Sequence, residues 1–103
     1  MKEIQILVLS SHEEILKTVL RLIHSQPGWE AKGVHSSEEA LNLCKQNLFD
    51  LILIGSGISD QETWDFKKEV SKINPSLPII QHYGGGSGLL FGEISQALNL
   101  DPA

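Results

Sequence analysis

The sequence predicts an α/β fold in which a short parallel sheet is covered by helices on both faces, giving three layers. Apolar runs typical of strands alternate four times with segments whose apolar residues recur at helical spacing. Such alternation favours parallel strands joined by helices, and right-handed crossovers leave few topologies. The apolar run at 50–54 is expected to be central, so we predict the strand order 2-1-3-4 within a single domain spanning 1–103.

The elements are expected in a strict order along the chain. Strands are expected at residues 3–9, 29–34, 50–54 and 77–81. Helices are expected at residues 12–25, 37–47 and 60–73, before a last helix that carries Leu90, Ile94, Ala97 and Leu98 at helical spacing. Within the helices, Cys44 and Trp64 are expected to face the core, and His24 and His35 to lie at the surface.

Three of the helix starts have the spacing of a capping box. In this arrangement a serine side chain accepts a hydrogen bond from the third helical N–H, and a glutamate reaches back to the serine. The pairs are Ser11 with Glu14, Ser36 with Glu39, and Ser59 with Glu62. Each cap is expected to contribute about 1 kcal/mol to stability.

Composition and charge exclude several classes of partner. The net charge is −5 and Arg21 is the single arginine, so the basic stripe of a nucleic-acid or anionic-membrane binder is missing. No apolar stretch approaches the roughly 20 residues of a membrane span, and the first residues read as a strand, without the features of a signal peptide. A lone Cys44 fits a reducing compartment. We therefore expect a cytoplasmic protein with no nucleic-acid partner, no membrane association and no cofactor.

The order and spacing of five segments resemble a receiver domain of the response-regulator family. They are Ile6–Ile15, Val34–Leu41, Phe49–Ile54, Trp64–Val70 and Leu77–Ile80. The resemblance covers roughly residues 1–83 and implies a flavodoxin-like fold. A fifth strand is not evident after the fourth, so we expect a version of that fold truncated after strand four.

The functional residues of that family do not carry over to this sequence. The pair of metal-binding acids falls on Ser10 and Ser11, and the phosphoacceptor aspartate falls on Gly55. The switch threonine or serine falls on Tyr83, or on His82 if the register slips by one, and the family lysine has no counterpart. Glycine cannot form an acyl phosphate, and Mg²⁺ prefers carboxylate ligands. The resemblance therefore implies a receiver without phosphoryl chemistry.

A run of glycines is the strongest positive candidate for a binding site. It comprises Gly84, Gly85, Gly86, Ser87 and Gly88, and is expected to precede the last helix, where its backbone N–H groups could hold an anion. No lysine accompanies it, so the P-loop pattern is absent. The favoured interpretation is a flexible glycine-rich connection from the fourth strand to the last helix, in place of a helix and strand that the chain has lost.

Histidines and serines supply weaker candidates at the same edge of the sheet. His12 and His82 could form a zinc site or an acid–base pair, but no third ligand stands at ligand spacing, which favours chance proximity. Ser10 or Ser11 could be a nucleophile beside His12, although helix capping explains Ser11 without any chemistry.

Two functional hypotheses follow. We favour a non-enzymatic pseudo-receiver that acts in signalling through contact with an unknown protein partner; the alternative is a small anion- or ligand-binding module built on Gly84–Gly88. Strand four, from Leu77 to His82, would be an unguarded sheet edge beside an apolar last helix with Leu89 and Phe91. This predicts a homodimer or a partner complex through strand four and the last helix.

Overall fold

A computed structural model describes residues 4–55, 57–81 and 87–98 of the chain. The elements follow one another as β1 (Ile4–Leu9), α1 (Glu13–His24), β2 (Trp29–Val34), α2 (Ser37–Gln46), β3 (Leu51–Ile54), α3 (Asp60–Ile73), β4 (Ile79–Gln81) and α4 (Ser87–Ala97). The four strands form one parallel sheet in the order β2-β1-β3-β4. The predicted α/β fold and strand order are therefore confirmed.

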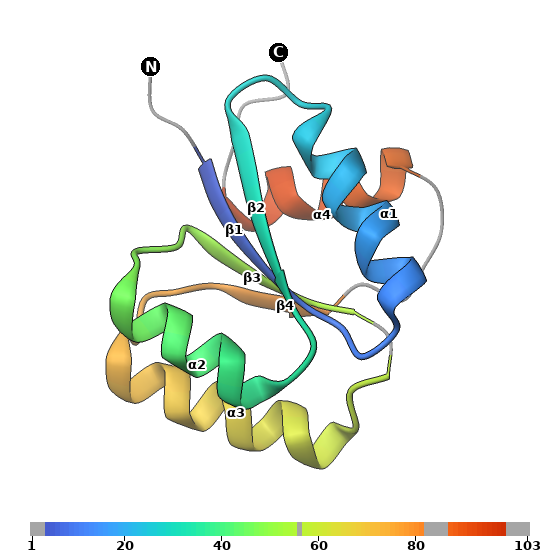
Figure 1. Cartoon of the computed structure of the whole chain (residues 1–103). Helices are drawn as coiled ribbons and strands as arrows, with labels where there is room; N and C mark the ends of the chain where they lie inside the picture. Colours follow the sequence, from blue (N-terminus) through green and yellow to red (C-terminus); the bar gives the residue numbers. More distant parts are fainter. Residues whose placement is uncertain (1–3, 56, 82–86, 99–103) are drawn as a thin grey trace.

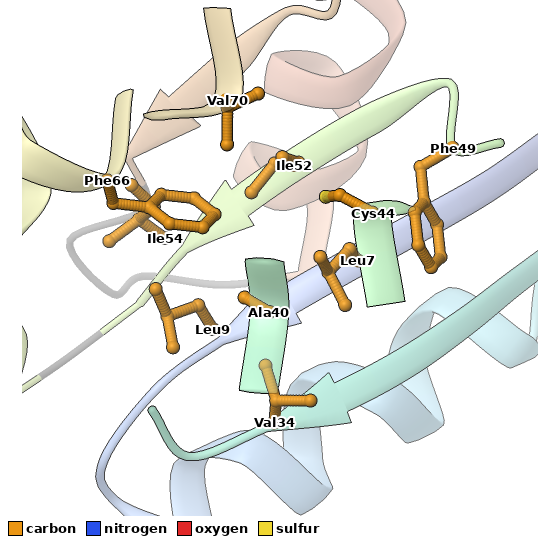
Figure 2. Close-up of a cluster of buried hydrophobic side chains, with 10 residues drawn as sticks. All are labelled: Leu7, Leu9, Val34, Ala40, Cys44, Phe49, Ile52, Ile54, Phe66 and Val70. Atoms are coloured by element: carbon orange, nitrogen blue, oxygen red, sulfur yellow. The ribbon is translucent and has the colours of Figure 1, made fainter. Parts of the chain in front are cut away.

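Helices cover both faces of this sheet, with α2 and α3 on one side and α1 and α4 on the other (Figure 1). The first face packs alternate residues of the two inner strands against α2 and α3 (Figure 2). Its buried members are Leu7, Leu9, Ile52 and Ile54 from the inner strands, Val34 from β2, Phe49 from the chain before β3, and Ala40, Cys44, Phe66 and Val70 from the helices. Because side chains alternate along a strand, the residues between them line the opposite face.

The second face joins β1 and β3 to α1 and α4. Its buried members are Ile6, Val8, Leu51 and Leu53 from the strands, with Leu16, Val19, Ile23 and Ile94 from the helices. Both inner strands are thus buried on both sides, which explains why they read as continuous apolar runs.

Two of the three predicted caps are confirmed by hydrogen bonds. The hydroxyl of Ser36 accepts from the N–H of Glu39 at 3.2 Å, and that of Ser59 accepts from the N–H of Glu62 at 3.1 Å. The prediction for Ser11 is wrong, because α1 begins one residue later with His12 at its N-cap and no side-chain cap. Ser11 instead lies against Gly57, at the carboxyl edge of the sheet.

Three further expectations need correction, namely the placement of Trp64, the start of β4 and the start of the last helix. Trp64 is 59% exposed and does not face the core, because Thr63, Phe66 and Val70 form the buried stripe of α3. β4 begins at Ile79, two residues later than predicted, since Pro78 has no N–H and offers the sheet only its carbonyl, which accepts from Ile52 at 2.9 Å.

The last helix begins earlier than expected, at Ser87. Ser87 and Gly88 therefore belong to α4 and not to a loop that precedes it. A helix tolerates such residues in its first turn, because the first four N–H groups have no intrahelical acceptor in any case.

The position of α4 makes β4 an edge of the described sheet. A parallel strand added beyond β4 by a right-handed crossover would need its connecting helix on the α3 side of the sheet. The next helix, α4, lies on the α1 side, where Ile94 joins the core (Figure 1). Among the described residues no fifth strand follows β4, as the sequence predicts.

Candidate functional site

The carboxyl ends of β1 and β3 bring the degenerate site positions side by side. These neighbouring strands pair in register from Ile6 with Leu51 to Leu9 with Ile54, so Ser10 and Gly55 follow at the same edge. The N–H of Gly55 donates to the carbonyl of Leu9 at 2.7 Å. In open α/β sheets this is the edge at which ligands bind.

Ser10 and Gly55 are packed closely enough to exclude a larger residue at position 55 without movement. Ser10 is 1% exposed, and its hydroxyl accepts from the N–H of His12 at 3.3 Å. A Cβ atom on Gly55 would lie 3.2 Å from the Cβ of Ser10 and 3.4 Å from its Oγ. The two positions that the resemblance assigns to an acid and to the phosphoacceptor therefore do meet in space, and small neutral residues occupy both.

Ser11 and His12 cover a second glycine at this edge. Gly57 has a φ of 85°, a conformation that side chains rarely adopt. A Cβ there would overlap the hydroxyl oxygen of Ser11 and approach Cδ2 of His12 at 2.7 Å. The loops after β1 and β3 are thus held against each other, and both Ser11 and His12 are exposed to solvent.

The donor set at this edge is a poor match for a divalent cation. Ser10 and Ser11 offer neutral hydroxyl oxygens, whereas hard cations such as Mg²⁺ prefer carboxylates. Within the part of the chain that the structure describes, no three His, Cys, Asp or Glu side chains come together as metal ligands. The residues present do not fit the magnesium site of a phosphorylatable receiver.

The remaining candidates fall partly outside the structure. His82, Tyr83, Gly84, Gly85 and Gly86 lie outside the described residues. The predicted pairing of His82 with His12, and the predicted anion-binding role of the glycine run, therefore remain predictions. No helix among the described residues is long and apolar enough to cross a membrane.

The other titratable side chains are either packed in the core or hydrogen-bonded to the backbone, and so contribute to the fold. Cys44 is buried, as expected, and burial raises the pKa of its thiol. His24 is exposed, as expected, and its Nε2 lies 3.1 Å from the backbone nitrogen of Ala31 in β2. The carboxylate of Asp50 accepts from the N–H of Gln5 at 2.8 Å and so ties the start of β3 to β1.

Sequence reasoning missed two surface features that the structure reveals. Leu48 is 88% exposed and Ile73 is 37% exposed, and both line one hollow at the amino edge of the sheet, opposite the candidate site. The signal available in the sequence was that Leu48 is a second apolar residue directly beside Phe49, whose side chain is the buried one of the two.

Comparison with solved structures shows that this is the fold of receiver domains. The chain is similar to the signal receiver domain of an HD domain-containing protein from Pseudomonas fluorescens Pf-5, with a TM-score of 0.82, 16% identity, and 96% of this chain and 89% of that one covered. It is also similar to a CheY-like receiver domain protein from Methanospirillum hungatei JF-1, with a TM-score of 0.80, 16% identity and 95% of each chain covered.

A third similar structure is a receiver domain protein from Clostridium thermocellum, with a TM-score of 0.77, 19% identity, and 93% of this chain and 94% of that one covered. No protein-family model matches the chain, and no curated protein matches it. At these identities the likeness concerns the fold, and the chemistry has to be argued from the residues at the site.

Proposed function

We propose that this protein is a receiver-fold module that acts in signalling through protein contacts and accepts no phosphoryl group. The observation that carries the proposal is the packing of Gly55 against the buried Ser10, where the resemblance places the phosphoacceptor beside an acid. Neither residue can form an acyl phosphate. The similar receiver domains support a signalling role for this fold, even where the phosphoryl chemistry is missing.

The surface proposed for a partner is the β4 edge together with α4. A groove of about 270 Å³ lies there, lined by Ile80, Glu93, Gln96 and Ala97. Residues 77–98 contain a single charged residue, Glu93, in a chain that is 20% charged. Depletion of charge is the compositional mark of an interface core, and an edge strand can extend its sheet with a strand from another protein.

Incubation with acetyl phosphate and Mg²⁺ tests the chemical half of the proposal. Intact mass is expected to stay unchanged, with a phosphorylatable receiver domain as the positive control in the same buffer. A second sample should carry Ser10→Asp, Ser11→Asp and Gly55→Asp together, to restore the acids that the family uses. A stable gain of one phosphoryl group by the unmodified protein would overturn the proposal.

The proposed contact with a partner protein is tested by a substitution in the β4 edge. The intact protein, used as bait in an extract of its own cells, is expected to retain a defined partner that Ile80→Lys releases. A partner retained equally by both versions would place the contact elsewhere.

A further inference from the structure

Four exposed side chains of α3 form one flank of the helix, which we call the Trp64 flank. They recur at the i, i+3, i+4 and i+7 spacing of a single helix face, and are Trp64, Lys67, Lys68 and Ser71. The indole of Trp64 is 59% exposed, and the ammonium of Lys68 lies 5.2 Å from its ring centroid. Because the hydroxyl of Ser71 donates to carbonyls of its own helix, the positive charge of this flank comes from the two lysines.

The Trp64 flank is the side of α3 that is turned away from α2. Ile73 lies toward α2, because it lines the hollow where the ends of the two helices meet. Trp64 precedes Ile73 by nine residues, or about two and a half helical turns, so it points the opposite way. Since α2 joins β2 to β3 and α3 joins β3 to β4, the side of α3 away from α2 lies toward the outer edge of β4.

No described element covers this flank, and all four of its side chains are exposed. The last described helix, α4, lies on the opposite face of the sheet together with α1 (Figure 1). On the α3 side, Ile79 of β4 packs against the core but is only half-buried. A helix laid against the flank would rest on Trp64 and cover Ile79, in the place where a further right-handed crossover would put its own helix.

The charges around this flank favour an acidic partner. Neither Lys67 nor Lys68 forms an ion pair with a described residue. The chain that leads from the end of α3 through β4, residues 74–81, contains no charged residue. A carboxylate brought to the two lysines would therefore meet no opposing acid from the neighbouring strand.

The acids of α3 itself do not neutralise the two lysines of the flank. Glu69 is paired with Lys72 at 3.0 Å, and Asp65 accepts a hydrogen bond at 3.2 Å from a glutamine one turn earlier. Asp60 lies in the first turn, four residues before Trp64, where a carboxylate is stabilised by the positive end of the helix dipole. The flank is thus negative at its amino end and positive in its carboxyl half, which fixes the direction that an acidic partner can take.

We propose that the Trp64 flank binds an acidic amphipathic helix of a partner protein. The apolar stripe of that helix packs on Trp64 and Ile79, and its carboxylates meet Lys67 and Lys68. Tryptophan is enriched among the residues that dominate binding energy, and complementary charge sets the orientation and the rate of association. The proposal rests on the proposed role in protein contacts, and it places one such contact on the α3 side of the β4 edge.

Fluorescence anisotropy of the full chain with a labelled helical peptide tests the proposal. The probe is an amphipathic peptide with leucine on one face and glutamate on the other. It is expected to bind at low ionic strength, and both Trp64→Ala and Lys67→Glu should weaken binding about tenfold. Lys45→Glu is the matched control, because it makes the same change in net charge on the exposed end of α2 and should leave binding intact.

Reversal of charge on both sides separates a specific contact from a loss of folding. The same peptide with lysine in place of glutamate should bind the double variant Lys67→Glu, Lys68→Glu more tightly than it binds the wild type. The proposal is overturned if the acidic peptide does not bind the wild type, or if Lys45→Glu weakens binding as much as Lys67→Glu does. Binding that is lost only with Ile80→Lys would also overturn it and would leave the proposed contact at β4 and α4 standing, whereas acetyl phosphate labelling bears on the proposed function alone.

Discussion

The two edges of the sheet are built differently. β2 has six residues, carries the exposed charges of Glu30 and Lys32, and has the imidazole of His24 at the N–H of Ala31. β4 has three residues, Ile79–Gln81, none of which is charged. Natural sheets guard their edges with charge, proline or a cover. β2 has both charge and a cover, and β4 has Pro78 at its start.

The packing of the helices against the two edge strands also differs, and it is tighter at β2 than at β4. α1 lies directly on β2, where a Cβ on Gly33 would stand 2.8 Å from a methyl carbon of Leu20 and 2.9 Å from one of Leu16. Behind β4 the groove beside α4 leaves Ile80 half-buried. Among the described residues, the β2 edge is therefore packed more closely than the β4 edge.

Enlarging the side chain behind each edge should give the largest contrast in stability. Gly33→Val is expected to lower the free energy of unfolding by about 2 kcal/mol, because its methyl groups would push α1 away from β2. Ile80→Phe is expected to change it by less than about 1 kcal/mol, since the added carbons can enter the groove. Urea denaturation of the two variants measures both values. Equal costs would show that the two edges are packed alike.

The architecture was predictable because the pattern of apolar residues is decided by burial on both faces. The run in β3 and the part of β1 from Ile6 to Leu9 have no alternation, and this property belongs to inner strands covered by helices on each side. The caps at Ser36 and Ser59 follow from local hydrogen bonding and were predicted for the same reason. Ser11 has the same spacing, but packing against Gly57 draws it away from α1.

Surface features were less accessible to sequence reasoning because they depend on which helices lie side by side. Trp64 fits an apolar stripe by composition, yet the stripe that α3 buries is set by Phe66 and Val70. Trp64 instead lies under the ammonium of Lys68, 5.2 Å from the ring centroid. The hollow beside Leu48 arises where the carboxyl ends of α2 and α3 meet, since Asn47 and Ile73, 26 residues apart in the sequence, both line it.

Removing the imidazole that covers the β2 edge should have an intermediate effect. His24→Ala is expected to lower the free energy of unfolding by about 0.5–1 kcal/mol, because the N–H of Ala31 loses a protein acceptor but can still reach water. Hydrogen exchange at the Ala31 amide should become faster. Glu30→Gln serves as the control, since this exposed substitution leaves the His24 contact with Ala31 in place and should leave that exchange rate unchanged. Unaltered exchange in His24→Ala would show that the imidazole does not guard this edge.

The smallest effect on stability, and the sharpest test of the β4 edge, is expected from adding a charged side chain to β4 and removing one from β2. Ile80→Lys adds to β4 the kind of charge that β2 already carries, and Lys32→Ile removes it from β2. Each change should alter the free energy of unfolding by less than about 1 kcal/mol, because a lysine stem can lie along apolar surface with its charge in water. Sedimentation should then show weaker association for Ile80→Lys and stronger association for Lys32→Ile. If the two substitutions leave association unchanged, the difference between the edges has no bearing on how the protein meets its partners.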